Sequence, residues 1–325
     1  MTNSTAVAHP NIALIKYWGK RDEALHLPTT TSLSMTLDVF PTETTVTLLD
    51  AGEDATTLNG AAAPGPFADK VSGFLDVVRT LAGDDRRARV DTVNSVPTAA
   101  GLASSASGFA ALALAASNAY GLDLDRRALS RLARRGSGSA SRSVFGGFAV
   151  WYRGEGTGAE GDLSSYAEPV DSALDAAMVV AVVDAREKTV SSRTAMRSTV
   201  ATSPLYRPWV DSSALDLVAI RQALADGDLV TVGEIAESNA LGMHATMLGA
   251  RPPIRYLAPA SVAVLDRVQQ LRSDGIAAYA TMDAGPNVKV LCARGDAADV
   301  DAALSEVAGV TSTRIARPGE GVQAR

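Results

Sequence analysis

The chain is poor in the residues that build disulfides and metal centres. Its 325 residues include one cysteine, Cys292, and three histidines, His9, His26 and His244. A single cysteine excludes an internal disulfide framework and a cysteine-based zinc site. The histidines are far apart in sequence, so we expect structural roles for them rather than a metal centre or a catalytic pair. Cys292 lies in a predicted strand, where a buried apolar role fits it better than that of a nucleophile.

Long apolar runs and an excess of positive charge are also missing. The longest apolar runs, residues 109–116 and 178–183, are far too short to span a bilayer, and no signal peptide opens the chain. A formal net charge of −6 and a pI near 5.2 argue against general binding to polyanions, so an anionic ligand needs a local basic site. We therefore expect a soluble, cytoplasmic protein with no nucleic-acid partner and no membrane contact.

The length and the residue pattern predict two domains of mixed helix and strand. A chain of 325 residues, 46% of them hydrophobic, exceeds what one hydrophobic core usually spans. Residues 153–169 are rich in glycine, serine and acidic side chains and indicate a surface loop near a boundary, so we place the domains at 1–172 and 173–325. Residues 32–39 and 44–49 predict a pair of strands. Hairpin-like connections favour an α+β fold over a doubly wound parallel sheet.

Apolar spacing predicts further elements in both halves of the chain. The expected helices cover residues 67–82, 102–120, 125–135, 213–225, 228–248, 260–273 and 297–307. The expected strands cover residues 89–93, 148–152, 178–183, 276–282 and 288–293.

Lysine is scarce, yet two of the five lysines lie within one segment of ten residues. Residues 11–20 read Asn-Ile-Ala-Leu-Ile-Lys-Tyr-Trp-Gly-Lys, so Lys16 and Lys20 flank a tyrosine, a tryptophan and a glycine. This pattern is typical of a strand and turn that present cations and backbone N–H groups to an anion. An edge strand with lysines at its solvated end would give the same pattern.

A run of small and hydroxyl-bearing residues precedes a predicted apolar helix. Residues 97–108 read Pro-Thr-Ala-Ala-Gly-Leu-Ala-Ser-Ser-Ala-Ser-Gly. Free N–H groups and the dipole at a helix start favour an anion, and Ser104, Ser105 and Ser107 add hydroxyl ligands for phosphate or Mg²⁺. The run has neither the Gly-Lys-Ser/Thr of a Walker A loop nor the Gly-x-Ser-x-Gly of hydrolases. A close-packed, alanine-rich helix with a serine cap is the alternative.

Three further segments combine hydroxyl groups or a carboxylate with tight turns. Residues 136–142, Gly-Ser-Gly-Ser-Ala-Ser-Arg, end in Arg142, whose guanidinium can bind phosphate or carboxylate through two nitrogens. Residues 187–193 place hydroxyl groups between cations, although a plain loop after a strand fits them too. Residues 281–287, Thr-Met-Asp-Ala-Gly-Pro-Asn, carry Asp283 on a turn between two strands, where a structural cap is the usual role of an aspartate.

Taken in order, these five segments resemble the diphosphomevalonate decarboxylase family of the GHMP kinase superfamily. The resemblance runs from about residue 8 to residue 293. The Pro-x-x-x-Gly-Leu-x-Ser-Ser-Ala loop is shared by the superfamily, whereas Tyr-Trp-Gly-Lys and Asp-Ala-Gly-Pro-Asn are typical of the decarboxylase branch. The resemblance implies an N-terminal domain like the second domain of ribosomal protein S5, a C-terminal ferredoxin-like domain, and an active site in the cleft between them.

The resemblance also implies a reaction and its ligands. Mevalonate 5-diphosphate and ATP, with Mg²⁺, would give isopentenyl diphosphate, ADP, phosphate and CO₂ in the mevalonate pathway of isoprenoid biosynthesis. A tertiary hydroxyl is a poor leaving group, so ATP first phosphorylates it, and loss of that phosphate then accompanies cleavage of the C–C bond. Phosphoryl transfer depends mainly on positioning and charge neutralisation. The habit of the family makes a homodimer the expected assembly.

Residue roles follow from the resemblance at the matching positions. Asp283 would be the catalytic base, Arg142 would hold the substrate carboxylate or the diphosphate, and Lys188 would tune the base. The residues expected to bind the diphosphate end are Tyr17, Trp18, Gly19, Lys20, Ser137, Gly138, Ser139, Ala140, Ser141, Arg142, Ser192 and Arg193. Those expected to bind the nucleotide are Thr92, Asn94, Pro97, Ala100, Gly101, Leu102, Ala103, Ser104, Ser105, Ala106 and Ser107, with Ser105 also a Mg²⁺ contact.

Small departures from the family pattern leave the expected reaction unchanged. Thr92 stands where many relatives carry serine, and Ser141 where some carry cysteine. A sibling kinase, a decarboxylase of the monophosphate and a non-catalytic metabolite sensor would share much of this sequence. Kinase-only relatives tend to lack the pattern that Asp283 and Lys16 complete, and a sensor would be expected to lose its base or its phosphate loop. We therefore favour the decarboxylase.

Overall fold

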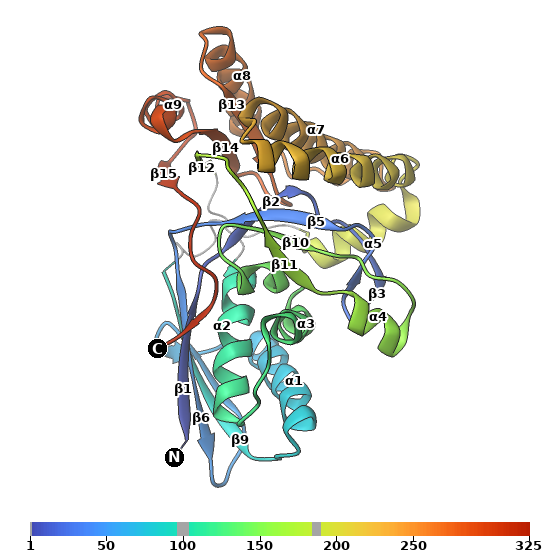
Figure 1. Ribbon diagram of the computed structural model, residues 1–325, viewed down its shortest axis with the longest axis vertical. Coiled ribbons are helices and arrows are strands. Elements are labelled where there is room, and N and C mark those ends of the chain that lie inside the picture. Colours follow the sequence, from blue (N-terminus) through green and yellow to red (C-terminus); the bar gives the residue numbers. More distant parts are fainter. Residues whose placement is uncertain (1, 96–103, 184–189) are drawn as a thin grey trace.

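The first half of the chain builds a sheet with helices packed beside it. The computed structural model describes residues 2–95, 104–183 and 190–325. In spatial order the strands of this sheet are β16 (Gln323–Ala324), β1 (Asn3–Ala8), β6 (Thr42–Leu49), β9 (Arg87–Asn94), β7 (Ala55–Leu58) and β8 (Ala61–Ala62). The helices beside it, seen in Figure 1, are α1 (Gly65–Ala82), α2 (Ser104–Ala119) and α3 (Arg126–Gly136).

Helix α2 is the centre of the first hydrophobic core. Its small side chains let the neighbouring strands and helices approach closely, and Ala110, Ala113 and Ala116 are fully buried. A helix that is apolar on nearly every side is an interior helix, which explains its weak amphipathic pattern. Phe109 of α2 packs edge-to-face on Phe74 of α1, with ring centroids 5.6 Å apart.

A second, antiparallel sheet lies between the two halves of the molecule. Its strands in spatial order are β11 (Ala167–Val170), β10 (Phe148–Trp151), β5 (Ser32–Thr36) and β2 (Asn11–Ile15). In Figure 1 this sheet crosses the middle of the molecule. Every residue of β2 and β5 is buried, because their apolar side chains pack into a core shared with the second half.

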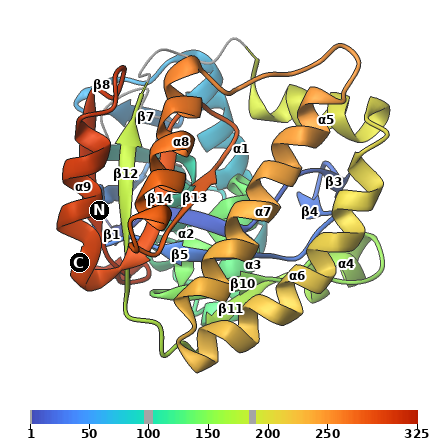
Figure 2. The ribbon, with the colours of Figure 1, turned by 90° about the horizontal axis from the view of Figure 1, so that it is seen from above.

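The second half packs long helices against a third antiparallel sheet. The strands in spatial order are β13 (Ala278–Met282), β14 (Val288–Ala293), β12 (Ala176–Val182) and β15 (Ser312–Ala316). The helices are α5 (Ser192–Thr202), α6 (Tyr206–Asp226), α7 (Leu229–Leu248), α8 (Pro259–Ser273) and α9 (Ala297–Ser305). Figure 2 shows α6 and α7 side by side over this half. Helix α7 also packs on β2, which joins the two halves.

Short elements and the C-terminal tail complete the fold. They are the hairpin β3 (Lys20–Asp22) and β4 (Leu27–Pro28), the helix α4 (Gly158–Ser164), and the 3₁₀ helices η1 (Gly138–Val144) and η2 (Arg294–Asp296). After β15 the chain returns to the first half, where Pro318 forms a bridge with Leu37 and β16 pairs with β1. Among the described residues no helix is both long enough and apolar enough to cross a membrane.

The α+β prediction is confirmed, and the helices and strands expected from apolar spacing are present. The predicted pairing of residues 32–39 with 44–49 is wrong, because β5 belongs to the middle sheet and β6 to the first sheet. Leu37 and Asp38 donate their backbone N–H groups to Pro10 and Arg317 instead, at 2.9 Å each, so the chain leaves one sheet for the other. The predicted loop 153–169 contains α4 and the start of β11, which are too short and polar to show periodicity.

Candidate active site

The carboxylate of Asp283 lies between two lysine ammonium groups. Asp283 is in the turn between β13 and β14, with Lys16 Nζ 3.0 Å from its Oδ1 and Lys289 Nζ 3.3 Å from its Oδ2. The lysine side chains are 1% and 2% exposed, whereas that of Asp283 is 30% exposed. Burial by itself would raise the pKa of Asp283, but the two ammonium groups hold that pKa well below its usual range. Asp283 is therefore an ionised, partly accessible acceptor.

Lys16 reaches Asp283 from the other half of the chain. It directly follows β2, and its backbone N–H donates to Asn239 Oδ1 on α7 at 2.9 Å. Its Nζ also donates to the carbonyl of Ala13 at 2.7 Å. Burial lowers the pKa of Lys16 to about 8, and the nearby charge of Asp283 opposes this shift. The packing of α7 on β2 thus holds the Lys16 ammonium group beside the Asp283 carboxylate.

The turn that carries Asp283 is fixed by His244 of α7. His244 Nε2 lies 3.2 Å from the carbonyl oxygen of Asp283, and because a carbonyl only accepts, Nε2 is the donor. Burial lowers the pKa of His244 to about 4, so its ring is neutral at physiological pH. His244 therefore acts on the backbone of the turn, in agreement with the structural role expected from the sequence.

Arg142 is a buried cation, and two of its three guanidinium nitrogens donate to neighbouring side chains. It lies in η1 and is 2% exposed. Its Nε donates to Asn11 Oδ1 at 3.1 Å, and Nη1 donates to the hydroxyl of Ser32. Burial lowers the pKa of Arg142 to about 10, partly opposed by Asp283 and Tyr17, so the guanidinium stays ionised. Within the described residues Nη2 has no hydrogen-bond partner, which leaves its two N–H groups for a ligand.

The hydroxyl of Tyr17 is buried and has no hydrogen-bond partner among the described residues. Its ring packs on Trp151 with centroids 4.7 Å apart, and burial raises the pKa of the hydroxyl. At Gly138 an added Cβ would lie 3.0 Å from this hydroxyl and 2.8 Å from Trp151. Buried hydroxyls nearly always have a partner, so this orphaned group fits a ligand that supplies one.

The turn after Tyr17 requires glycine. Gly19 has a φ of 96°, and an added Cβ would lie 2.0 Å from the hydroxyl of Tyr206. That hydroxyl donates to the carbonyl of Trp18 at 2.9 Å, and the Trp18 side chain is buried against α6 and α7. The turn is thereby anchored to the second half, and it leads directly to Lys20.

The segment Ser137–Ser141 is held by hydrogen bonds to its backbone. Asn11 Nδ2 donates to the carbonyl of Ser139 at 2.9 Å, and Ser141 Oγ donates to the carbonyl of Gly138 at 2.8 Å. Ala140 is fully buried. Ser137 Oγ contacts Ser105 Oγ of α2 at 3.3 Å, so this segment adjoins the start of the helix that follows the predicted phosphate loop.

A cavity of about 260 Å³ opens between α1, α2 and the strands of the first sheet. Its walls are mostly apolar, with a few polar groups, as small-molecule sites usually are. The residues that line it are Thr42, Leu58, Phe67, Lys70, Val71, Thr92, Asn94, Ser105, Gly108, Phe109 and Leu112. Thr92, Asn94 and Ser105, which the sequence assigned to the nucleotide, therefore lie at one site.

Lys70 of α1 lines this cavity, and the charges of Lys20 of β3 and Arg193 of α5 act on it. We call these three residues the cation cluster. Burial, together with the charges of Arg193 and Lys20, lowers the pKa of Lys70 to about 8. The pKa of Lys20 is also lowered, by burial and by Arg193 and Arg197, against the attraction of Glu23, whose Oε2 is 3.3 Å away. Repulsion between like charges of this kind is typical of a site that binds an anion.

Comparison with known families identifies the protein family of this chain. The model of the diphosphomevalonate decarboxylase-like N-terminal domain matches residues 8–167, and that of the mevalonate 5-diphosphate decarboxylase C-terminal domain matches residues 178–318. The chain belongs to the diphosphomevalonate decarboxylase family. The diphosphomevalonate decarboxylase of Aspergillus fumigatus is 36% identical over 94% of this chain and 80% of its own length. That of Homo sapiens is 36% identical over 92% and 79%, respectively.

Solved structures of decarboxylases share the whole architecture, which confirms the expected two-domain GHMP kinase fold. The mevalonate diphosphate decarboxylase of Staphylococcus aureus superposes with a TM-score of 0.95 at 43% identity, covering 100% of this chain and 98% of that one. The mevalonate diphosphate decarboxylase of Enterococcus faecalis gives 0.93 at 45% identity, covering 100% and 99%. A structure described as MDDEF in complex with MVAPP, AMPPCP and magnesium gives 0.94 at 46% identity, again covering 100% and 99%.

Not every residue expected from the family pattern falls on the described part of the chain. Lys188 and the loop residues Pro97 and Ala100–Ala103 lie outside the described residues, so their roles stay predictions. Ser192 opens α5, and Arg193 follows it with an exposed side chain. Ala106 and Ser107 are fully buried, and Ser107 Oγ lies 2.7 Å from Thr42 Oγ1. Ser104 opens α2 next to Ser105.

Sequence reasoning missed several residues that this decarboxylase family member brings to the site. Lys289 neutralises Asp283, Lys70 lines the cavity, and Asn11 joins Arg142 to the Ser139 carbonyl. The scarcity of lysine was a usable signal, because Lys16, Lys20, Lys70 and Lys289 all lie in this region. Asn11 had no comparable signal, since its importance comes from contacts with residues about 130 positions later.

Proposed function

We propose that this chain catalyses the ATP-dependent decarboxylation of mevalonate 5-diphosphate in the mevalonate pathway. The products are isopentenyl diphosphate, ADP, phosphate and CO₂. The observation that carries the proposal is the ionised carboxylate of Asp283, held 3.0 Å from Lys16 at the seam between the halves. The orphaned hydroxyl of Tyr17 and the free donor of Arg142 support the same site as the place where the substrate binds.

The first step transfers the γ-phosphoryl group of ATP to the 3-hydroxyl of the substrate. Asp283 accepts the hydrogen bond of that hydroxyl, orients its oxygen and takes its proton as the P–O bond forms. Lys16 and Lys289 make Asp283 a weak base. A weak base is sufficient, because a loose phosphoryl-transfer transition state needs an oriented nucleophile more than a strong base. Lys16 also places positive charge where the transferred group carries negative charge.

The second step expels the new phosphate while the bond to the carboxylate breaks. The electron pair of that C–C bond forms the alkene, and CO₂ and phosphate leave. Arg142 binds the carboxylate or the diphosphate through its free nitrogen, and Asn11 and Ser32 fix the plane of its guanidinium. Orienting the carboxylate relative to the leaving phosphate is the largest contribution this residue can make.

ATP occupies the cavity between α1 and α2 in this proposal. Phe67, Leu58 and Phe109 contact its apolar parts, while Lys70 lies on the same wall. The hydroxyl of Ser105, which lines this cavity, would contact the Mg²⁺ that accompanies the nucleotide. The cation cluster neutralises the phosphates of the two substrates where they approach each other.

The domain and assembly predictions are part of this proposal. The boundary at residues 172 and 173 is supported by the two family models, which leave residues 168–177 unmatched. The C-terminal strand β16 lies outside this division into two domains, because it pairs with β1 of the first domain. We also propose a homodimer. Leu215 and Val218, one turn apart on α6, are 74% and 72% exposed and are available for burial in a subunit contact.

A coupled product assay tests the function. Purified protein receives ATP, Mg²⁺ and mevalonate 5-diphosphate labelled at the carboxyl carbon, and CO₂ and ADP are followed together. We expect equal amounts of both. ADP without CO₂ would identify a kinase, and neither product, with ligand binding retained, would identify a sensor. The monophosphate as a second substrate separates the alternative decarboxylase.

A further inference from the structure

Asn239 is a buried amide on α7 whose oxygen and nitrogen are both hydrogen-bonded. It is 2% exposed. Its Oδ1 accepts the backbone N–H of Lys16 at 2.9 Å, and its Nδ2 donates to the Ser213 hydroxyl at 3.0 Å and to Asp216 Oδ2 at 2.8 Å. An asparagine side chain offers an acceptor oxygen and two N–H donors. A side chain with only one of these functions could not serve all three partners.

Helix α6 fixes the position of Asn239. Ser213 and Asp216 lie three residues apart on α6, and Trp209 of the same helix donates its Nε1 hydrogen to the Asn239 carbonyl at 3.1 Å. The two helices lie side by side in Figure 2. They approach so closely that a Cβ added at Gly242 of α7 would lie 2.9 Å from Trp209. The amide therefore cannot turn away from Lys16 without breaking contacts to α6.

The residue that Asn239 binds is the one whose side chain reaches Asp283. Lys16 follows β2, the outer strand of the middle sheet, and its side chain is 1% exposed. Asn239 accepts its N–H, and the Thr30 hydroxyl donates to its carbonyl at 3.1 Å. A buried backbone N–H needs a partner, and beside an outer strand a side chain from another element can supply it. Both polar groups of the Lys16 backbone are therefore held by side chains.

The carbonyl of Ala13 joins Lys16 to the strand that precedes Asp283. It accepts from Lys16 Nζ at 2.7 Å and from the Thr281 hydroxyl at 3.3 Å, and Thr281 lies in β13, two residues before Asp283. The pairing of β2 with β5 shifts register between Ala13 and Ile15. Irregularities of this kind redirect side chains and are frequent next to active sites. The ammonium group is thus bound to the Ala13 carbonyl and to Asp283 Oδ1 together, and a shift of the Lys16 backbone would weaken one contact or both.

We propose that Asn239 is a positioning residue for the phosphoryl-transfer step, because it holds the Lys16 backbone so that the ammonium group stays against Asp283 Oδ1. This inference rests on the proposed function, in which Asp283 is the base and Lys16 brings positive charge to the transferred group. A displacement of about 1 Å can cost about 10²-fold in rate. Asn239 acts through Lys16, so its loss should lower kcat more than it changes KM.

Displacement of Lys16 would also change the ionisation of Asp283. The cations that act on this carboxylate are Lys16, Lys289 of β14 and Arg142 of η1, while the neutral ring of His244 on α7 binds its carbonyl. Burial by itself raises the pKa of Asp283, and the two lysines hold that pKa well below its usual range. With Lys16 withdrawn, the pKa rises. Since the base must be ionised, kcat then falls as the pH drops through the raised value.

Exchange of two neighbouring side chains tests the proposal. Asn239→Ala removes the acceptor of the Lys16 N–H. Asn239→Asp keeps an acceptor but places a second carboxylate against Asp216, where like charges repel. The double variant Asn239→Asp with Asp216→Asn returns an N–H donor to this pair and leaves the net charge of the protein unchanged. For each full-length protein, kcat and KM for both substrates are measured between pH 5 and pH 9, and denaturant unfolding gives the stability.

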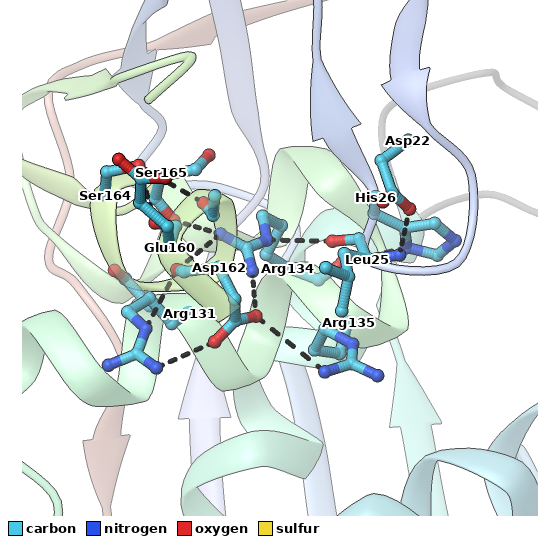
Figure 3. Close-up of polar contacts among 12 residues, drawn as sticks. Asp22, Leu25, His26, Arg131, Arg134, Arg135, Glu160, Asp162, Ser164 and Ser165 are labelled. Carbon is cyan, nitrogen blue, oxygen red and sulfur yellow. Dashed lines mark hydrogen bonds and ion pairs between the residues drawn. The ribbon is translucent and has the colours of Figure 1, made fainter. Parts of the chain in front are cut away.

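A polar cluster around Arg134, which Figure 3 shows, provides the control. The Arg134 side chain is fully buried, its Nε donates to the carbonyl of Leu25 at 3.1 Å, and its guanidinium pairs with Asp162. Asp162 also binds Arg131 at 2.7 Å. As at Asn239, a buried side chain binds the backbone of a neighbouring element. Asp162→Asn weakens this cluster, so it should lower the free energy of unfolding and leave the pH profile of kcat unchanged.

We expect Asn239→Ala to lower kcat by about 10–100-fold, to change KM less than about threefold, and to make kcat fall at a higher pH on the acidic side. Asn239→Asp should also lose kcat, and the double variant should recover it to within a few-fold.

Unchanged kcat in either single variant, or a double variant no faster than Asn239→Asp, would overturn this inference and leave the decarboxylase assignment intact. If Asn239→Ala does not fold, Asn239→Asp and the double variant decide the question by the same criteria. Failure of the unmodified protein to form CO₂ would instead overturn the proposed function.

Discussion

The charges around Asp283 and those around Lys20 are arranged in opposite ways. Asp283 has a lysine within about 3.3 Å on each side, and two of the three guanidinium nitrogens of Arg142 nearby are oriented by neighbours. In the cation cluster, the charge of Arg193 lowers the proton affinity of both Lys70 and Lys20, and the charge of Lys20 also lowers that of Lys70. The first region is ordered before any ligand arrives, as electrostatic catalysis requires. The second is short of negative charge, as tight binding of phosphate requires.

In the proposed function, the region around Asp283 performs the chemistry and the cation cluster binds the phosphates of the substrates. A substitution in the first region should lower kcat, because its interactions strengthen in the transition state. A substitution in the second should mainly raise KM, because phosphate is held equally before and during the reaction. The changes below test this division from the largest expected effect to the smallest.

Replacement of Asp283 should have the largest effect. We expect Asp283→Asn to lower kcat by about 10²–10⁴-fold, the usual value of a general base, with substrate affinity changed only a few-fold. Steady-state assays give kcat, and calorimetry gives the affinity. Glu237→Gln is a suitable control, since Glu237 pairs with Arg272 at 2.9 Å beside the same strand but outside the site. A variant that keeps more than about a tenth of the rate would remove Asp283 from the role of base.

Replacement of Arg142 should lower kcat more than it raises KM. Arg142→Ala removes the charge that orients the carboxylate, and we expect a loss of about 10²-fold in kcat, comparable to the removal of one oriented catalytic donor. Arg126→Ala is the matched control, because Arg126 binds the backbone carbonyls of Val144 and Val322 in the same region. An effect confined to KM would move Arg142 from the chemical region to the binding region.

Lys70 should contribute to the decrease of kcat/KM for ATP at alkaline pH. Its pKa of about 8 lies below the ordinary value, so it loses its charge as the pH rises from about 7 to 9. We expect kcat/KM for ATP to fall over that range, since this ratio reports the free enzyme. Lys70→Arg keeps its charge and should reduce this fall, leaving the part that comes from Lys16, whose pKa is also about 8. An unchanged profile in Lys70→Arg would exclude Lys70 as its origin.

Loss of the N-cap of α3, which lies away from both Asp283 and the cation cluster, should change the free energy of unfolding and leave kcat and KM unchanged. The Asp125 carboxylate accepts the N–H of Ala128 at 2.7 Å and begins α3, which ends next to His26 and Ser137. Asp125→Ala should lower the free energy of unfolding by about 1 kcal/mol. Denaturant unfolding measures this, with Asp125→Asn as the control that keeps a cap. A change of more than about threefold in kcat or KM would show that α3 transmits strain into the site.

Particular residues show how far sequence could predict this site. The segments containing Asp283, Arg142 and Tyr17 were found because their motifs are local and resemble a family pattern. Their contacts were not predictable from spacing, since Lys16 and Asp283 are 267 positions apart. The predicted pairing of residues 32–39 with residues 44–49 was wrong for a related reason. The turn after β5 looks local, but the backbone there bonds to Pro10 and Arg317.

A single-turnover experiment on Asp283→Asn tests the central claim most directly. Enzyme in excess is mixed with ATP, Mg²⁺ and carboxyl-labelled mevalonate 5-diphosphate, and ADP and CO₂ are quantified at each quench time. If Asp283 serves the phosphoryl transfer, both products slow together by the same factor while the substrates remain bound. ADP formed at the rate of the unmodified enzyme, with CO₂ delayed, would contradict the account and place Asp283 in the elimination step.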